Sequence, residues 1–367
     1  MKLKTYIIFI TISAVFLSCQ DSEKETHQDS IPQKETTSYK LLVKKPDSIA
    51  VPEGMKWVSG VKFTMGATED DPYALPREKP AHPVAVDGFF MDVTEVTNAE
   101  FARFVEETGY VTVAERPIDW EEMKKQLPAG TPKPHDSILQ PGSLVFRKSL
   151  EKVTNLNDYS QWWEWEIGAD WRHPYGPGTN IEGKMNYPVV HVSYEDALAY
   201  CKWAGRSLPT EAEWEAAAKG QLNGGIYTWG DEEKELNENA NTWQGSFPTE
   251  NKPEDGFSYA APVKSFPPNS IGLYDMAGNV WEITTDWFDV NYYKQALNEG
   301  ELINPEGSQT SYNPDNPYEM QKVMKGGSFL CNKSYCASYR ISARMGMSLD
   351  SGTDHVGFRT VLRPEKK

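Results

Sequence analysis

The sequence predicts an α+β fold, in a single large, loop-rich domain with low secondary-structure content, over residues 52–363. Only three segments carry complete helix signals, and the other apolar segments are as short as strands. The chain of 367 residues also holds 27 Gly and 25 Pro, which favour turns and loops. Hydrophobic residues make up 39% of the chain, which is enough for a packed core.

Two segments precede this domain. Residues 1–19 resemble a bacterial lipoprotein signal, because Lys2 and Lys4 precede an apolar run that ends at Cys19, the expected lipidation site. A simple cleaved signal peptide is the alternative. Residues 20–50 are polar and lack periodicity, so we expect a disordered tether. The protein is therefore expected to be exported and lipid-anchored to a membrane of the cell envelope, facing the periplasm or the outside.

The domain begins with short strands. Met55–Met65 predicts two strands around a turn at Ser59–Gly60, and residues 83–91 predict a strand, a turn and a strand. Residues 116–150 are rich in Pro and charge, which predicts a long surface insertion. Residues 162–177 and 239–268 are expected to be loops.

Three helices have clear start and stop signals. Each opens at Ser or Thr, a residue that caps the free N–H groups of a helix start, and each closes near a Gly. The expected limits are Thr97 to Gly109, Ser193 to Gly205 and Thr210 to Gly220.

The charge of the chain excludes one class of partner. With 37 basic and 53 acidic residues, the formal net charge is −16, which argues against nucleic acid. It weakly favours a basic partner or one that carries an exposed Arg. Short motifs exclude other classes, since no H-x-x-x-H, G-x-S-x-G, Walker or dinucleotide motif occurs. His82, His173 and His191 are expected to be hydrogen-bonded structural residues.

The strongest chemical signal is the segment Lys325–Arg344, which contains Cys331 and Cys336. A thiol is a nucleophile, a redox centre and a soft metal ligand, and two close thiols can combine these roles. In an exported protein, two nearby cysteines also commonly form a structural disulfide. C-x4-C is not a zinc-ribbon pattern, and the spacing alone leaves the disulfide and the metal or redox pair open.

Residues 52–363 resemble the formylglycine-generating enzyme (sulfatase-modifying factor) family. The blocks that carry the resemblance run in the family's order, and GGSFLCNKSYC resembles the signature of the copper-dependent members that oxidise a target cysteine to formylglycine. The resemblance implies the family's compact, mixed fold, which is related to the C-type lectin fold. The main blocks are GVKFTMG (60–66), ADWRHPYGPG (169–178), GRSLPTEAEWE (205–215), GLYDMAGNVWE (272–282), KGGSFLCNKSYC (325–336) and VGFR (356–359).

The resemblance also implies the chemistry. Cys331 and Cys336 would bind Cu(I), and dioxygen would oxidise a cysteine of an unfolded sulfatase precursor within a C-x-P-x-R type motif. Ser328, Trp281 and Tyr335 match active-site positions. Animal members carry stapling disulfides at the positions of Cys201 and three residues that are not cysteine here, which favours free thiols at the pair. Those three residues are Ala217, Ile341 and Thr360.

Two sets of oxygen ligands match structural calcium sites of the family. Calcium prefers mixed carboxylate and carbonyl shells in irregular loops, and ordinary turn chemistry is the alternative explanation. The first set is Asn241, Thr242, Asp255 and Phe257, and the second is Asp275, Gly278, Val280 and Glu282.

A second function of another class also fits a domain of this kind. Similar domains serve as non-catalytic structural lipoproteins of envelope gliding or secretion machinery, but such members commonly lack the cysteine pair. A sulfoxide synthase would need a histidine-rich iron site, which this sequence does not offer. Lys333 and residues 345–348 depart from the usual family pattern and are expected to line the substrate groove. We expect a monomer.

Overall fold

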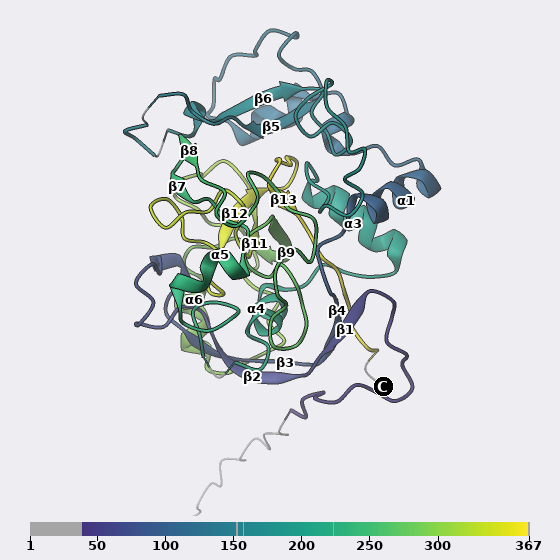
Figure 1. Cartoon of the computed structure of the whole chain (residues 1–367), viewed down its shortest axis with the longest axis vertical. Helices are drawn as coiled ribbons and strands as arrows, with labels where there is room; N and C mark the ends of the chain where they lie inside the picture. The colour runs from purple at the N-terminus through teal and green to yellow at the C-terminus, as the bar shows by residue number, and fades with distance from the viewer. Residues whose placement is uncertain (1–38, 152, 157, 223, 366–367) are drawn as a thin grey trace, which may run out of the picture. The chain divides into compact units, whose positions relative to one another are not determined.

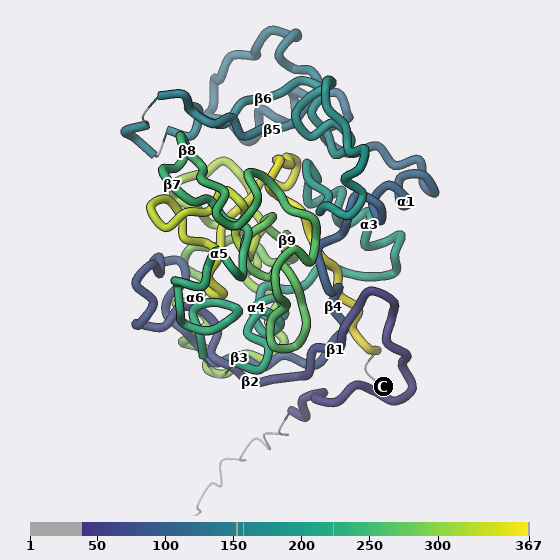
Figure 2. The backbone as a smooth tube through the Cα atoms, viewed as in Figure 1, coloured from purple at the N-terminus to yellow at the C-terminus, as the bar shows by residue number. Residues whose placement is uncertain are grey.

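The computed structural model describes residues 39–151, 153–156, 158–222 and 224–365. Leu41–Lys367 forms one compact unit, whose trace is shown in Figures 1 and 2. The predicted signal segment with Cys19, and most of the predicted tether, lie outside the described residues. The prediction of a tether to residue 50 was wrong from Leu41 onward. Leu42 donates its N–H to Asp87 Oδ1 (2.8 Å) and accepts from the N–H of Gly88 (2.7 Å).

The described residues form short strands in five small sheets. The sheets have the strand orders β1-β4-β14, β10-β3-β2, β12-β11-β9-β13, β5-β6 and β7-β8. The strands are β1 (Met55–Val58), β2 (Val61–Met65), β3 (His82–Val86), β4 (Phe89–Asp92), β5 (Gly142–Phe146), β6 (Trp163–Ile167), β7 (Gly245–Ser246), β8 (Glu250–Asn251), β9 (Trp281–Trp287), β10 (Leu302–Ile303), β11 (Gln321–Lys325), β12 (Met345–Ser348), β13 (Val356–Gly357) and β14 (Val361–Leu362).

The helices confirm the three capping signals. Each predicted helix starts after the predicted cap, and each cap side chain accepts the third N–H of its helix. The helix α6 lacks a side-chain cap, so the sequence has no helix start signal there and the helix was not predicted. The helices are α1 (Asn98–Thr108), α2 (Trp120–Met123), α3 (Tyr194–Ala204), α4 (Glu211–Lys219), α5 (Leu236–Asn239) and α6 (Tyr292–Glu299). Among the described residues, no helix is long and apolar enough to cross a membrane.

The two strands expected around Ser59–Gly60 exist, but they belong to different sheets. Gly60 lies where the chain passes from one sheet to the other. A Cβ on Gly60 would stand 2.2 Å from the carbonyl oxygen of Leu42, so only glycine fits there. The segment is therefore a crossing between sheets and not a hairpin.

The expected surface insertion and the loop after it contain a two-stranded sheet. β5 and β6 pair antiparallel, with Phe146 opposite Trp163. In Figure 1 this sheet lies at the top, above the sheet of β9, β11, β12 and β13. The prediction missed it because β5 is buried against distant residues and carries no local hairpin signal, since a long connection separates it from β6.

The central four-stranded sheet positions the cysteine segment. β9 pairs antiparallel with β11 and parallel with β13, and most of its residues are buried. β11 is buried throughout and ends at Lys325, directly before the glycine pair of the segment. The cysteine segment therefore begins at the end of a fully buried strand.

Candidate active site

The cysteine segment begins at a turn that only glycine can form. Gly326 and Gly327 adopt φ values of 89° and 74°, in the left-handed region. A Cβ on Gly327 would lie 2.7 Å from the carbonyl carbon of Ser338. The two ends of the loop thus touch at Gly327 and Ser338, which closes the loop around the cysteines.

Cys331 and Cys336 lie side by side as free thiols, with their Sγ atoms 2.9 Å apart. Cys331 is buried, whereas Cys336 is half-buried. Asn332 holds the turn between them, because its carbonyl accepts the N–H groups of Tyr335 and Cys336 (both 2.9 Å). Its side-chain amide donates to the carbonyl of Trp243 (2.8 Å). Cys201 is a buried free cysteine on α3, as predicted.

The two thiols differ in acidity. Burial raises the pKa of Cys331 well above its usual value, and the neighbouring Cys336 raises it further. Burial also opposes ionisation of Cys336, but hydrogen bonds from Cys331 and Ser338 outweigh burial and lower its pKa to about 7. A thiolate therefore forms first at Cys336, the more accessible sulfur, and a thiolate is the form that binds a soft metal.

Ser328 contacts Cys331, and Trp281 lies in the same core cluster. The N–H of Ser328 points at Cys331 Sγ (3.4 Å), and the Ser328 side chain is fully buried. Trp281 starts β9 and packs in the same core cluster as Cys331, and its N–H donates to the carbonyl of His355 (2.8 Å). Cys331 thus lies against the backbone of Ser328, in the same buried core as the Trp281 indole.

Tyr335 belongs to an aromatic wall next to the thiols. Its ring stacks on Phe247 with centroids 4.4 Å apart, and it meets Trp162 edge-on at 5.9 Å. Phe146 of β5 packs into the same cluster. The phenol therefore has a packing role in addition to any chemical one.

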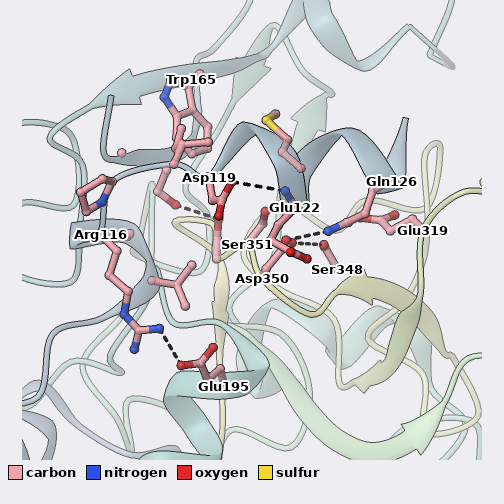
Figure 3. A pocket seen from close by; sticks show the side chains of 18 of the residues that line it. Arg116, Asp119, Glu122, Gln126, Trp165, Glu195, Glu319, Ser348, Asp350 and Ser351 are labelled. Carbon is pink, nitrogen blue, oxygen red and sulfur yellow. Dashed lines mark hydrogen bonds and ion pairs between the residues drawn. The ribbon is translucent and has the colours of Figure 1, made fainter. Parts of the chain in front are cut away.

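An acidic cavity of about 580 Å³ opens at the other end of β5. Figure 3 shows Asp119 at the start of α2, Asp350 near Gln126, and Arg116 turned toward Glu195. Trp165 supplies an aromatic side, and Ser348 lines the cavity as expected for the departing segment 345–348. Its carboxylate-bearing residues are Asp119, Glu122, Glu195, Glu319 and Asp350.

A second cavity, of about 860 Å³, lies on the loop that joins the thiols. Asn332, Lys333 and Ser334 line it, together with Trp243 and residues of α5. Lys333 is exposed and lies 3.8 Å from Glu233. Lys333 and Ser348 therefore each line a cavity, and that of Lys333 adjoins the cysteine segment.

Comparison with known proteins decides the family. The family model described as "Sulfatase-modifying factor enzyme 1-like domain" matches residues 42–364. This chain belongs to the sulfatase-modifying factor family.

Relatives support the assignment over most of the chain. A protein named formylglycine-generating enzyme from Mus musculus is 41% identical over 87% of this chain and 77% of its own length. Another protein of that name, from Mycobacterium tuberculosis, is 44% identical over 83% of this chain and 96% of its own. A third relative, named inactive C-alpha-formylglycine-generating enzyme 2, from Mus musculus, is 37% identical over 83% of this chain and 84% of its own.

The fold is shared with more distant structures. The structure of PvdO from Pseudomonas aeruginosa superposes with a TM-score of 0.57 at 22% identity, and covers 88% of this chain and all of its own. At this identity the likeness shows the fold alone. The predicted family and the predicted mixed fold of low secondary-structure content are thus confirmed.

The pair suits the copper that the family resemblance implies. Two free thiols lie together, and the more accessible one, Cys336, also has the lower pKa; soft sulfur ligands select Cu(I). Within the residues that the structure describes, no group of three or more His, Cys, Asp or Glu side chains could hold a metal ion. The candidate metal site of this sulfatase-modifying factor domain therefore rests on the two cysteines.

The residues of the first predicted calcium set lie close together. Asp255 accepts the N–H groups of Thr242 (2.9 Å) and Phe257 (3.0 Å), which brings these residues next to Asn241. Asn241 is buried, and its Oδ1 atom has no hydrogen-bond partner among the described residues. A buried oxygen without a partner is costly, and a cation would satisfy it. These residues fit a calcium ion.

In the second predicted calcium set, the carboxylate of Glu282 already pairs with a buried cation of the protein. Both carboxylate oxygens of Glu282 bind the buried guanidinium of Arg359 (2.6 Å each), and Oε2 also accepts from Trp214 Nε1 (2.7 Å). Arg359 therefore balances the charge of Glu282, whereas Oε1, which accepts a single hydrogen bond, keeps an electron pair; calcium at this set stays a prediction. Asp275 accepts the N–H of Lys264 (2.8 Å), and the sequence could not reveal the competing partner Arg359 of Glu282.

The three predicted structural histidines each contact a backbone carbonyl. His82 lies 3.2 Å from the oxygen of Pro80, His173 lies 2.6 Å from that of Thr179, and His191 lies 2.8 Å from that of Pro174. Their structural role is thus confirmed.

Sequence reasoning missed His355 and the tryptophans of the aromatic wall. His355 Nδ1 lies 3.4 Å from Ser328 Oγ, and the ring of Trp163 meets His355 edge-on at 4.9 Å. A signal was present, because His355 directly precedes the block VGFR. Trp162 and Trp163 stood in a segment expected to be a loop.

Proposed function

We propose that this protein is an exported, copper-dependent oxidase that converts a cysteine of sulfatase precursors to Cα-formylglycine with dioxygen. Membership of the sulfatase-modifying factor family supports a sulfatase-activating enzyme. The observation that carries the proposal is the pair of free thiols, with sulfur atoms 2.9 Å apart, beside Ser328 and Trp281.

Cys331 and Cys336 would hold Cu(I), which supplies a centre where a substrate thiol and dioxygen can meet. The protein's own residues would do the rest. Burial around Cys331 and Trp281 excludes bulk water, and Ser328 offers a hydroxyl group for a hydrogen bond with an oxygen species. The reaction turns CH₂–SH into an aldehyde and releases the sulfur as hydrogen sulfide. Dioxygen takes electrons from the substrate carbon and from an added thiol reductant, and becomes water and the aldehyde oxygen.

The substrate would be an unfolded segment of the C-x-P-x-R type. In an extended peptide, the Arg of this motif lies about 13 Å from its Cys. β5 covers the same number of residues, from Gly142 at the acidic cavity to Phe146 in the cluster beside Tyr335. A bound peptide that spans this same distance would therefore place its Cys near the thiols and its Arg among the carboxylates of the cavity, such as Asp119.

Several further properties belong to the same proposal. The lipid anchor at Cys19 would hold the enzyme at a membrane of the cell envelope. Calcium at Asn241, Thr242, Asp255 and Phe257 would stabilise the loops that precede the site, and the enzyme would act as a monomer.

A structural lipoprotein of a gliding or secretion machine is the second candidate. It has support in the relative named inactive, which shows that likeness of this extent does not by itself establish activity. What favours the enzyme is the free cysteine pair.

The test is mass spectrometry of a C-x-P-x-R peptide incubated aerobically with Cu(I)-loaded protein and a thiol reductant. We expect a loss of about 18 Da, the mass difference between cysteine and formylglycine, and its absence in Cys331→Ser and Cys336→Ser. Cys201→Ser is the matched control and should convert the peptide. No conversion by the folded, copper-loaded wild type would instead favour the structural lipoprotein.

A further inference from the structure

His355 is held next to the thiol pair by backbone pairing. It directly precedes β13, which pairs with the start of β9, and its carbonyl accepts the N–H of Trp281 (2.8 Å). This contact fixes the backbone of His355, and Nδ1 of its ring lies 3.4 Å from Ser328 Oγ. Trp163 covers the ring from another side, with centroids 4.9 Å apart. The imidazole is thus confined by elements far apart in the sequence.

The ring of His355 is neutral. Burial disfavours its charged form, His191 adds to the effect, and together they lower the pKa of His355 to about 3. A neutral imidazole has one nitrogen that donates and one that accepts. The ring can therefore define the direction of a hydroxyl group beside Nδ1 in a way that a charged ring, with two donors, could not.

The other contacts of Ser328 do not fix the direction of its hydroxyl hydrogen, so His355 is the side chain that can fix it. Ser328 Oγ accepts the N–H of Leu330 (3.3 Å), and the N–H of Ser328 points at Cys331 Sγ (3.4 Å). The hydroxyl group itself has one hydrogen, and His355 Nδ1 lies within hydrogen-bond distance as an acceptor for it. Whether that hydrogen faces the imidazole or the thiols is then decided by this one contact.

We propose that His355 is a positioning residue for formylglycine formation, which fixes the rotamer and the hydrogen direction of Ser328 beside Cys331. The inference rests on the proposed function, since it assigns Ser328 a part in that reaction. In the resting protein, Nδ1 accepts the hydrogen of Ser328, and Oγ keeps an electron pair toward the thiols. Loss of the imidazole frees the hydroxyl group to turn within the pocket.

Kinetics of four variants test this role. His355→Phe keeps the ring packing on Trp163 but cannot hydrogen-bond, whereas His355→Gln can still present an acceptor. We expect His355→Phe to lower kcat roughly 10- to 100-fold, while the KM of the peptide stays within about twofold of the wild-type value. The decrease in kcat should be smaller in His355→Gln. The loss should not add to that of Ser328→Ala, so the double variant should be within about twofold of Ser328→Ala alone. Wild-type kcat in His355→Phe, or additive losses, would overturn the inference.

A second measurement does not need copper or turnover. In the metal-free protein, ¹⁵N NMR of the histidine rings reports whether Nδ1 carries a hydrogen, and His355→Gln identifies the resonance. We expect an unprotonated, hydrogen-bonded Nδ1 in wild type, which shifts in Ser328→Ala. An unchanged resonance in Ser328→Ala would contradict the contact. An inactive wild type overturns the proposed function itself, whereas an active wild type with fully active His355→Phe overturns this inference alone.

Discussion

Arg340 and Glu78 form a buried, bidentate ion pair. Nη1 of Arg340 lies 2.8 Å from Oε2 of Glu78, Nη2 lies 3.1 Å from Oε1, and both side chains are almost fully buried. Arg340 shortly follows Cys336, so the pair fastens the cysteine segment to a distant turn (Pro76–Glu78) of the first part of the domain. Arg344 does the same with Glu211 at the start of α4 (2.8 and 2.9 Å). The segment that carries the thiols is therefore anchored by charge at its C-terminal end.

Glu78→Gln should destabilise the protein by about 3–5 kcal/mol, because it leaves the buried guanidinium of Arg340 with less of its compensating charge. Chemical denaturation measures the free energy of unfolding. The control is Glu122→Gln, which breaks an exposed pair with Lys125 and should cost less than about 1 kcal/mol. Equal effects of the two variants would show that the buried pair does not anchor the segment.

Cys336 should react with iodoacetamide in its thiolate form with a midpoint near pH 7, because its pKa is about 7. Cys331→Ala removes the neighbouring thiol that stabilises this thiolate, so the midpoint should move upward. Mass spectrometry of alkylated peptides across pH measures both midpoints, with the buried Cys201 as an internal control that stays unmodified. An unchanged midpoint in Cys331→Ala would mean that the two sulfurs do not interact.

Asp354→Asn should increase the free energy of unfolding relative to wild type, and the increase should grow as the pH rises. Burial raises the pKa of Asp354 to about 7 in the folded protein, above the ordinary value of 3.8 that we expect in the unfolded chain. Between these values the folded state binds more protons, so the stability that Asp354 contributes is complete below pH 3.8 and is lost toward pH 7. Asn cannot ionise and can still accept from the N–H of Phe146, as Asp354 Oδ2 does (3.1 Å).

The measurement is the free energy of unfolding of wild type and Asp354→Asn from pH 4 to pH 8. Relative to wild type, the free energy of unfolding of the variant should rise by roughly 4 kcal/mol at most from pH 4 to pH 8. Asp136→Asn is the matched control, because Asp136 is exposed and pairs with Lys133, and its difference from wild type should stay nearly flat. A flat difference for Asp354→Asn too would show that Asp354 does not change its protonation on folding.

Removal of calcium should lower the melting temperature of wild type. Any ligand that binds only the folded state stabilises it, by about 2.7 kcal/mol at a hundredfold excess over Kd. Thermal unfolding with calcium and with EGTA measures the shift, which should vanish in Asn241→Ala because the buried oxygen of Asn241 is lost. Glu282→Gln tests whether the second predicted calcium set, which includes Glu282, also contributes to this shift. If its EGTA shift also vanishes, Glu282 binds the ion despite Arg359.

Asp119→Asn should raise the KM of a C-x-P-x-R peptide by roughly 3- to 10-fold, because it removes a charge from the acidic cavity. The amide keeps an oxygen that can cap α2, where Asp119 accepts the N–H of Glu121 (2.8 Å), so the fold should persist. With a peptide in which Gln replaces the Arg, wild type and variant should have the same KM. An unchanged KM with the Arg peptide would place the Arg elsewhere.

By itself the sequence determined the features that depend on neighbours in the chain. The capping residues Thr97, Ser193 and Thr210 specified three helices because a helix end is satisfied within one turn. The motif around Cys331 and Cys336 specified the family, since its residues are contiguous.

Only the tertiary structure decided which distant residues meet. The contact between His355 and Ser328, the pairing of β5 with β6, and the partners of Glu282 and Arg340 each join segments that no local pattern relates. The physical reason is that a buried charge or hydrogen-bonding group must find a partner, but many chain positions could supply one. The packing of the whole domain selects among them, and it pairs Glu282 with Arg359.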